Sequence, residues 1–67
     1  LNLPRKIREL NAEYRRVGAM IEAVRGSHRK IRHPKYPGCV IVSGRSGEDA
    51  KRYQEKDLRT FIELIKK

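Results

Sequence analysis

Apolar side chains near the start of the chain recur at spacings of four and three residues, which is the repeat of one face of an α-helix. They are Leu3, Ile7, Leu10, Tyr14 and Val17. Pro4 suits the first turn of a helix, and Gly18 is well placed as a left-handed stop at its end. The pattern therefore predicts a helix over residues 4–17.

A second apolar stripe lies near the other end of the sequence. It consists of Leu58, Phe61, Ile62 and Ile65. We expect this helix to begin near Tyr53 or Gln54 and to carry charges that match the helix dipole at both ends. Those charges are two acids in its first turn and two lysines in its last, namely Glu55, Asp57, Lys66 and Lys67.

Three short segments between the helices are typical of β-strands. Residues 19–24 are mostly apolar and bounded by glycines, and residues 39–42 are apolar and β-branched. Residues 28–33 contain one aliphatic side chain among five polar ones, so a helix there would bury almost no apolar surface. Cys39 would begin the third strand as a small core residue. A glycine-containing turn at residues 25–27 and a proline-containing turn at 34–38 would join the strands into two hairpins. The expected result is a three-stranded antiparallel sheet.

Side chains alternate between the two faces of a strand, so Ile31 should face the helices while His28, Lys30 and Arg32 share the opposite face. The fold class predicted is α+β, one small domain over residues 1–67, in the order helix-strand-strand-strand-helix. Both helices would cover one face and leave a basic face open. The glycine-containing loop 43–51 is expected to be mobile, and two interpretations of Arg45 within it stay open: phosphate contact or simple flexibility.

Charge points to a polyanionic partner. The 67 residues include 17 Lys+Arg against 8 Asp+Glu, a formal net charge of +9. No acid occurs between residues 25 and 35, where the basic side chains are Arg25, Arg29, Lys30, Arg32 and Lys35. Such a stretch attracts nucleic acid through counterion release. The alternative is that the charge only confers solubility.

Other classes are disfavoured by composition. No run reaches the roughly 18 apolar residues of a membrane span, and residues 1–8 lack the apolar stretch of a secretory signal, so we expect a cytoplasmic protein without membrane attachment. One cysteine cannot form an internal disulfide. A chain this short builds only one modest core, which argues against a large enclosed cofactor pocket, and no cofactor is expected.

Two histidines are the candidates for proton transfer near neutral pH. His28 follows a glycine-serine turn in the basic stretch, although a histidine that merely ends a hairpin would look the same. His28 and His33 have opposite parity on a strand, so a shared metal is not expected. Tyr36 is interpreted as an exposed turn residue, with base stacking as the alternative.

Two segments together resemble HicA-type toxins, the RNA-cleaving members of toxin-antitoxin pairs. The first is Arg25-Gly26-Ser27-His28 with the basic strand and His33-Pro34 after it, and the second is the stretch from Gly47 to Gln54 before the closing helix. The resemblance covers nearly the whole chain. It implies a fold like the double-stranded-RNA-binding domain, mRNA as substrate, an inhibitory HicB-type antitoxin, and a homodimer or a toxin-antitoxin hetero-oligomer as assemblies. Ala19 departs from the bulky aromatic residue usual in the family.

The same resemblance makes His28 the catalytic residue, with Gly26 and Ser27 as its matching neighbours. A neutral imidazole would accept the proton of a ribose 2′-hydroxyl while that oxygen attacks phosphorus, giving a cyclic phosphate without a metal. The candidates for contacting RNA and stabilising the developing charge are Arg25, Arg29, Lys30 and Arg32, of which Lys30 and Arg32 are favoured. The competing functions are a non-catalytic nucleic-acid-binding module and a protein-interaction domain with solubilising charge.

Overall fold

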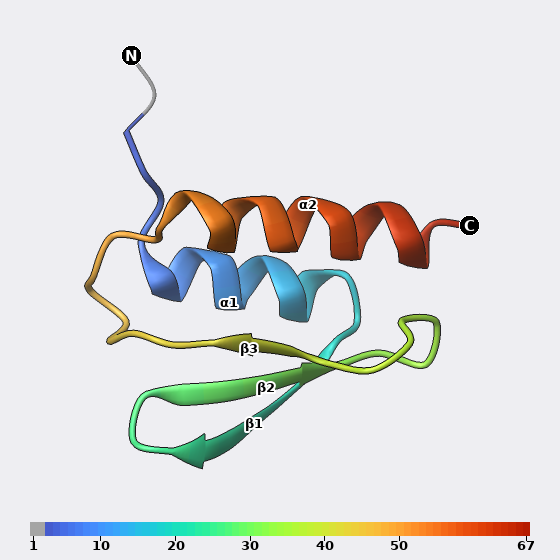
Figure 1. Cartoon of the computed structure of the whole chain (residues 1–67), viewed down its shortest axis with the longest axis horizontal. Coiled ribbons are helices and arrows are strands. Elements are labelled where there is room, and N and C mark those ends of the chain that lie inside the picture. The colour runs from blue at the N-terminus through green and yellow to red at the C-terminus, as the bar shows by residue number, and fades with distance from the viewer. Residues whose placement is uncertain (1–2) are drawn as a thin grey trace.

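The computed structural model describes residues 3–67. Its elements are α1 (Ile7–Arg16), β1 (Met20–Arg25), β2 (His28–Arg32), β3 (Val40–Val42) and α2 (Arg52–Ile65). The strands form an antiparallel sheet in the order β1-β2-β3. Both helices lie on the same side of this sheet and run in the same direction (Figure 1). This confirms the predicted α+β class and element order.

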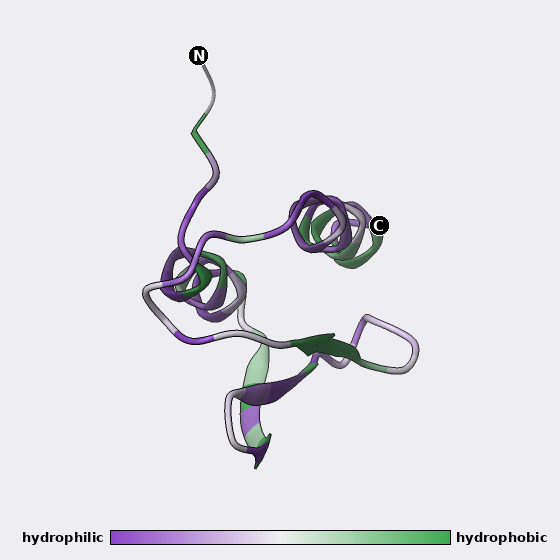
Figure 2. Cartoon of the chain, turned by 60° about the vertical axis from the view of Figure 1, so that its left-hand side comes forward, coloured by the Kyte–Doolittle hydropathy of each residue, from purple (hydrophilic) through white to green (hydrophobic). Residues whose placement is uncertain are grey.

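The register of the strands decides which side chains reach the core. Ile21, Ile31 and Val40 are aligned across the sheet, and Ile31 is completely buried, so this row faces the helices. The next row contains Glu22, Lys30 and Ile41 and faces the other way. Figure 2 shows the hydrophobic β3 close beneath the helices, whereas the β1–β2 hairpin extends away from them.

Aromatic rings form the centre of the core. The ring of Tyr14 meets the ring of Phe61 edge-on, with 5.0 Å between centroids and an interplanar angle of 85°. Tyr36 lies against the same phenylalanine at 4.5 Å and is partly buried. The prediction of an exposed tyrosine in this turn was therefore wrong, because the turn folds back over the end of α2.

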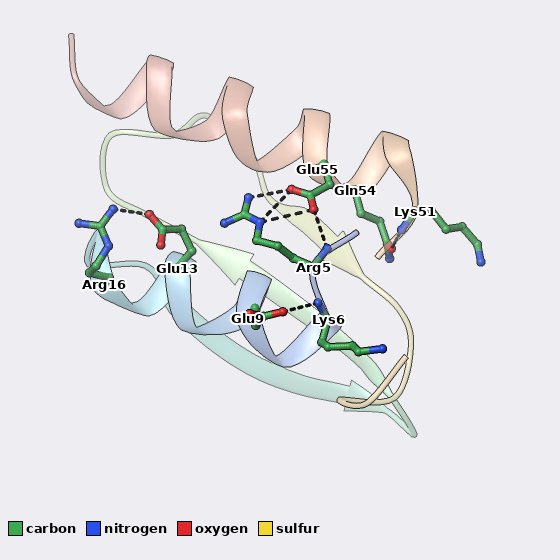
Figure 3. A network of polar contacts seen from close by, with 8 residues as sticks. All are labelled: Arg5, Lys6, Glu9, Glu13, Arg16, Lys51, Gln54 and Glu55. Carbon is green, nitrogen blue, oxygen red and sulfur yellow. Dashed lines mark hydrogen bonds and ion pairs between the residues drawn. The ribbon is translucent and has the colours of Figure 1, made fainter. Parts of the chain in front are cut away.

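Helix α1 is shorter at its start than the apolar repeat predicted. It begins at Ile7, so Pro4 precedes the helix, and Leu3 is 85% exposed instead of belonging to the buried stripe. The carboxylate of Glu9 accepts the backbone N–H of Lys6 at 2.6 Å, which satisfies an otherwise free amide at the helix start (Figure 3). The left-handed stop is confirmed, because Gly18 has φ +91°.

Helix α2 begins one residue earlier than the first of the two positions predicted. Its start resembles that of α1, because the side-chain Oε1 of Gln54 accepts the backbone N–H of Lys51 at 2.8 Å. Glu55 is the only acidic residue in the first turn of α2, and no basic residue lies in its last turn. The predicted match of charge to dipole therefore holds for that one acid alone, since Asp57 lies later and the two terminal lysines follow the end of the helix at Ile65.

The third strand and the loop after it also differ from expectation. Cys39 is exposed and precedes β3, because buried Val40 and Val42 place the odd-numbered positions on the other face. The loop 43–51 is anchored to the start of α1. Its carbonyl oxygens accept the first helical N–H groups, from Ile7 to Glu48 at 2.8 Å and from Arg8 to Ser46 at 3.0 Å. The loop predicted to be mobile is thus tied to α1 by two backbone hydrogen bonds, and these two amides are unavailable to a ligand.

Candidate nucleic-acid interface

His28 is exposed at the beginning of β2, immediately after the turn that reverses the chain. The turn depends on Gly26, whose φ of +54° lies in the left-handed region that side chains with a Cβ rarely adopt. Arg25 pairs with His28 across the turn, after a β-bulge that shifts the register of β1. The predicted site residue therefore stands at the end of the sheet, open to solvent.

The imidazole of His28 has a hydrogen-bond partner that the sequence did not reveal. Its Nδ1 lies 2.9 Å from the side-chain Oγ of Ser43. Ser43 follows β3, and the pairing of Arg29 with Val42 brings the two residues opposite each other. The alternation along β3 could have placed Ser43 on the open face, but only the register between β2 and β3 identifies its neighbour.

Ser43 is in turn held by a buried residue of α2. The side-chain Nε2 of Gln54 donates to the backbone carbonyl of Ser43 at 2.8 Å, while its Oε1 accepts the N–H of Lys51. Gln54 is only 4% exposed. A single amide thus ties the start of α2 to the end of β3. A glutamine near the start of a helix does not reveal this role, because only the fold brings Ser43 next to it.

Three of the four predicted RNA-binding cations separate into two groups. Lys30 and Arg32 lie on the face of the sheet opposite Ile31, as expected. Arg29 belongs to the row of buried Val42, on the helix side. Its Nη1 donates to the carbonyls of Gly26 at 2.8 Å and His28 at 3.1 Å, and so braces the turn.

The open face is less uniformly basic than the linear sequence indicated. Exposed Glu22 of β1 lies directly across from Lys30. Two apolar side chains share the same face, Met20 at 61% and Ile41 at 45% exposure. Counting charges between residues 25 and 35 overlooked these neighbours because strand pairing brings them in from outside that segment.

The second histidine has a different environment. The ring of His33 meets Phe61 edge-on at 6.0 Å between centroids, and its Nδ1 accepts the backbone N–H of Lys35 at 3.0 Å. His33 is partly buried on the core side, away from His28. Among residues 3–67, no three His, Cys, Asp or Glu side chains gather in a way that could hold a metal ion.

A hollow of about 320 Å³ lies at the same end of the molecule as the turn. Its walls come from the turn residues Gly26 and Ser27, from Arg29, from the loop segment 44–46 and from Asn11 of α1. Ser27 directly precedes His28, and the loop segment directly follows Ser43. The hollow is therefore lined by chain neighbours of both His28 and Ser43.

The pair has a defined chemical capacity. A hydroxyl both donates and accepts, so Ser43 can bond Nδ1 in the neutral ring and in the imidazolium. Nε2 is then the nitrogen that exchanges a proton with a bound group. Lys30 lies on the same face and could supply positive charge for a phosphate.

No helix within residues 3–67 has the length and apolar character needed to span a membrane. Comparison with protein-family models, curated proteins and solved structures yields no significant match to this chain.

Proposed function

We propose that the protein is a metal-independent endoribonuclease, the toxin of a type II toxin-antitoxin pair, which cleaves mRNA in the cytoplasm and is inhibited by a HicB-type antitoxin. The observation that carries this proposal is the contact between Nδ1 of His28 and Oγ of Ser43. It orients an exposed imidazole at the end of a basic sheet. The motif resemblance around Gly26 and Ser27 supports the same conclusion.

The reaction uses the nucleophile that RNA carries. Nε2 of His28 accepts the proton of the 2′-hydroxyl, the 2′-oxygen bonds to phosphorus, and the bond from phosphorus to the 5′-oxygen breaks. The products are a 2′,3′-cyclic phosphate and a 5′-hydroxyl, and the departing 5′-oxygen takes its proton from water. Lys30 and Arg32 stabilise the charge that develops on the phosphoryl oxygens. Positioned proton transfer contributes about 10²- to 10⁴-fold.

The decisive experiment compares the two histidines. The wild-type protein should cleave single-stranded RNA in the presence of EDTA and leave a cyclic phosphate. His28→Ala should abolish cleavage but keep most RNA affinity, because backbone contacts dominate binding. His33→Asn is the matched control, since its amide oxygen can still accept the Lys35 N–H, and it should remain active.

A second candidate is a non-catalytic RNA-binding module. It is favoured by one observation: within residues 3–67, the recorded side-chain partner of His28 is a hydroxyl, with no acid bonded to the ring. Under this function the wild-type protein binds RNA without cutting it. Cleavage that persists in His28→Ala would rule out the role assigned to this residue.

A further inference from the structure

The hollow beside the turn lies on the other side of the sheet from the imidazole of His28. Arg29 contributes to its wall from the helix side of β2, and Arg45 contributes from the loop after β3. The two arginines thus come from segments that are separate in the sequence. Open hollows lined by two arginines and small polar residues suit a phosphate group, which arginine binds through paired N–H donors.

Hydrogen bonds hold the backbone around both arginines in place. Arg29 uses Nη1 to brace the turn, and its Nε and Nη2 donate no hydrogen bond to residues 3–67. The backbone of Arg45 is held by Glu48, whose N–H donates to the Arg45 carbonyl at 2.9 Å and whose carboxylate accepts the Arg45 N–H at 3.2 Å. The side chain of Arg45 is left exposed beside the hollow.

Asn11 supplies an independent observation. Its side-chain Oδ1 is buried and has no hydrogen-bond partner among residues 3–67. A buried acceptor without a partner is costly and rare in folded proteins. Asn11 lines the hollow, and a turn of its side-chain amide would bring Oδ1 to a ligand hydroxyl there. A hydroxyl both donates and accepts, and it therefore pairs with either orientation of the amide.

We propose that this hollow binds one nucleotide of an RNA strand, with its phosphate on Arg29 and Arg45 and its ribose 2′-hydroxyl on Asn11. The 2′-hydroxyl is the group that distinguishes RNA from DNA at a binding site. Because residues of its wall directly precede His28 and directly follow Ser43, this nucleotide is next along the RNA to the one held at His28. The RNA strand passes around the end of the sheet at the β1–β2 turn.

This inference rests on the RNA-binding part of the proposed function and is independent of cleavage. The test therefore uses His28→Ala protein, which leaves the substrate intact, with a single-stranded RNA oligonucleotide and a DNA oligonucleotide of the same base sequence. Adding Asn11→Ala should weaken RNA binding about three- to tenfold, the range of one hydrogen bond, and should leave DNA binding unchanged. Equal effects on RNA and DNA, or none on RNA, would overturn the assignment of Asn11.

Arg45→Gln should weaken RNA and DNA alike and lower the logarithmic salt slope by about 0.7, the value for one phosphate on a single strand. Arg59→Gln on α2 is the charge-matched control and should change the slope less. If the two substitutions act equally, the phosphate contact is refuted.

A spectroscopic measurement covers the case in which a substitution disturbs folding. In protein that carries only His28→Ala, RNA should shift the NMR signals of the Asn11 side-chain amide, and DNA should shift them less. Unchanged Asn11 signals at RNA saturation would overturn the proposal. If the Asn11 and Arg45 tests fail but wild-type protein still cleaves RNA, only this inference is refuted. If the protein binds RNA without cleaving it, only the proposed nuclease activity is refuted.

Discussion

Oγ of Ser43 lies 2.9 Å from Nδ1 of His28, although the two residues are 15 positions apart in the sequence. The contact exists because β2 and β3 pair in a register that places the residue before Arg29 opposite the residue after Val42. A hydroxyl partner fixes the plane of the imidazole without adding charge to the site. Nε2 is then the ring nitrogen left for a bound group.

Replacing Ser43 tests whether this contact positions the imidazole. Ser43→Ala should lower the cleavage rate about tenfold, the effect of losing roughly 1.4 kcal/mol of orientation. The ¹⁵N chemical shifts of the His28 ring should show a change in the balance of its tautomers. Ser43→Thr keeps the hydroxyl and should restore both readouts. Ser46→Ala, in the adjacent loop, is the control for a general loss of loop structure.

A second prediction concerns the stability provided by the buried amide of Gln54. Gln54→Ala removes its bonds to the carbonyl of Ser43 and to the N–H of Lys51. Urea unfolding should show a loss of about 1–3 kcal/mol, because two partly buried backbone groups lose their partners. Tyr53→Ala, at the exposed neighbouring position, should cost less than about 0.5 kcal/mol. Equal losses in both variants would contradict the role assigned to the amide.

Much of the architecture was predictable from the sequence because it depends on local repeats. The helical spacing of Leu10, Tyr14 and Phe61 with their neighbours, and the single buried Ile31 among polar residues, identify the core faces without any knowledge of tertiary contacts. Helix ends were less accurate, since α1 begins where Glu9 can satisfy the Lys6 amide rather than at the first proline.

The candidate site was only partly predictable. The turn and His28 are adjacent in the chain, so a local motif reveals them. Ser43, Asn11 and Glu22 reach the same end or face of the molecule through sheet register and helix packing, which depend on pairings between distant segments. A charge count along the sequence cannot see such neighbours.

The ion pair between Arg5 and Glu55 predicts how stability depends on pH. Nη2 of Arg5 donates to the Glu55 carboxylate at 2.7 Å and links the segment before α1 to α2 (Figure 3). This hydrogen bond, more than the accompanying charge attraction, lowers the pKa of Glu55 from its ordinary value of 4.5. The stabilisation is therefore present above about pH 4.5 and is lost as the pH falls through the lower pKa of the folded state.

Urea unfolding of Glu55→Gln checks this dependence. At pH 7 the variant should be less stable than wild type by about 0.5–1 kcal/mol, because the pair is partly exposed and such pairs contribute little. The difference should shrink at pH 3. A difference that grows on acidification would contradict the sign derived from the lowered pKa.

Cys39 should behave as a surface thiol. It is exposed before β3, so a thiol reagent should modify the folded protein completely without denaturant. Its modification should leave the thermal midpoint nearly unchanged. Cys39→Ser should likewise keep stability within about 0.5 kcal/mol of wild type. If the thiol instead reacts only after the protein unfolds, Cys39 lies in the core, as the sequence predicted.

Removing the hydroxyl of Tyr14 is predicted to leave stability unchanged or to raise it, which is unusual for a change in a core aromatic residue. Tyr14 is completely buried, and its OH has no partner among residues 3–67. Burial, the largest cause, raises its pKa because the charged phenolate would be desolvated. Tyr14→Phe keeps the edge-on contact with Phe61 and removes an unsatisfied polar group, so it should leave stability unchanged or raise it by about 1 kcal/mol.

Thermal unfolding provides the measurement, since 1 kcal/mol corresponds to a shift of about 4–8 °C in Tm for a domain of this size. Phe61→Ala is the contrasting variant and should cost about 3–5 kcal/mol by leaving a cavity where three aromatic rings meet. A loss of more than 1 kcal/mol in Tyr14→Phe would show that the hydroxyl is bonded in solution. The core would then contain a polar anchor and not an apolar ring contact alone.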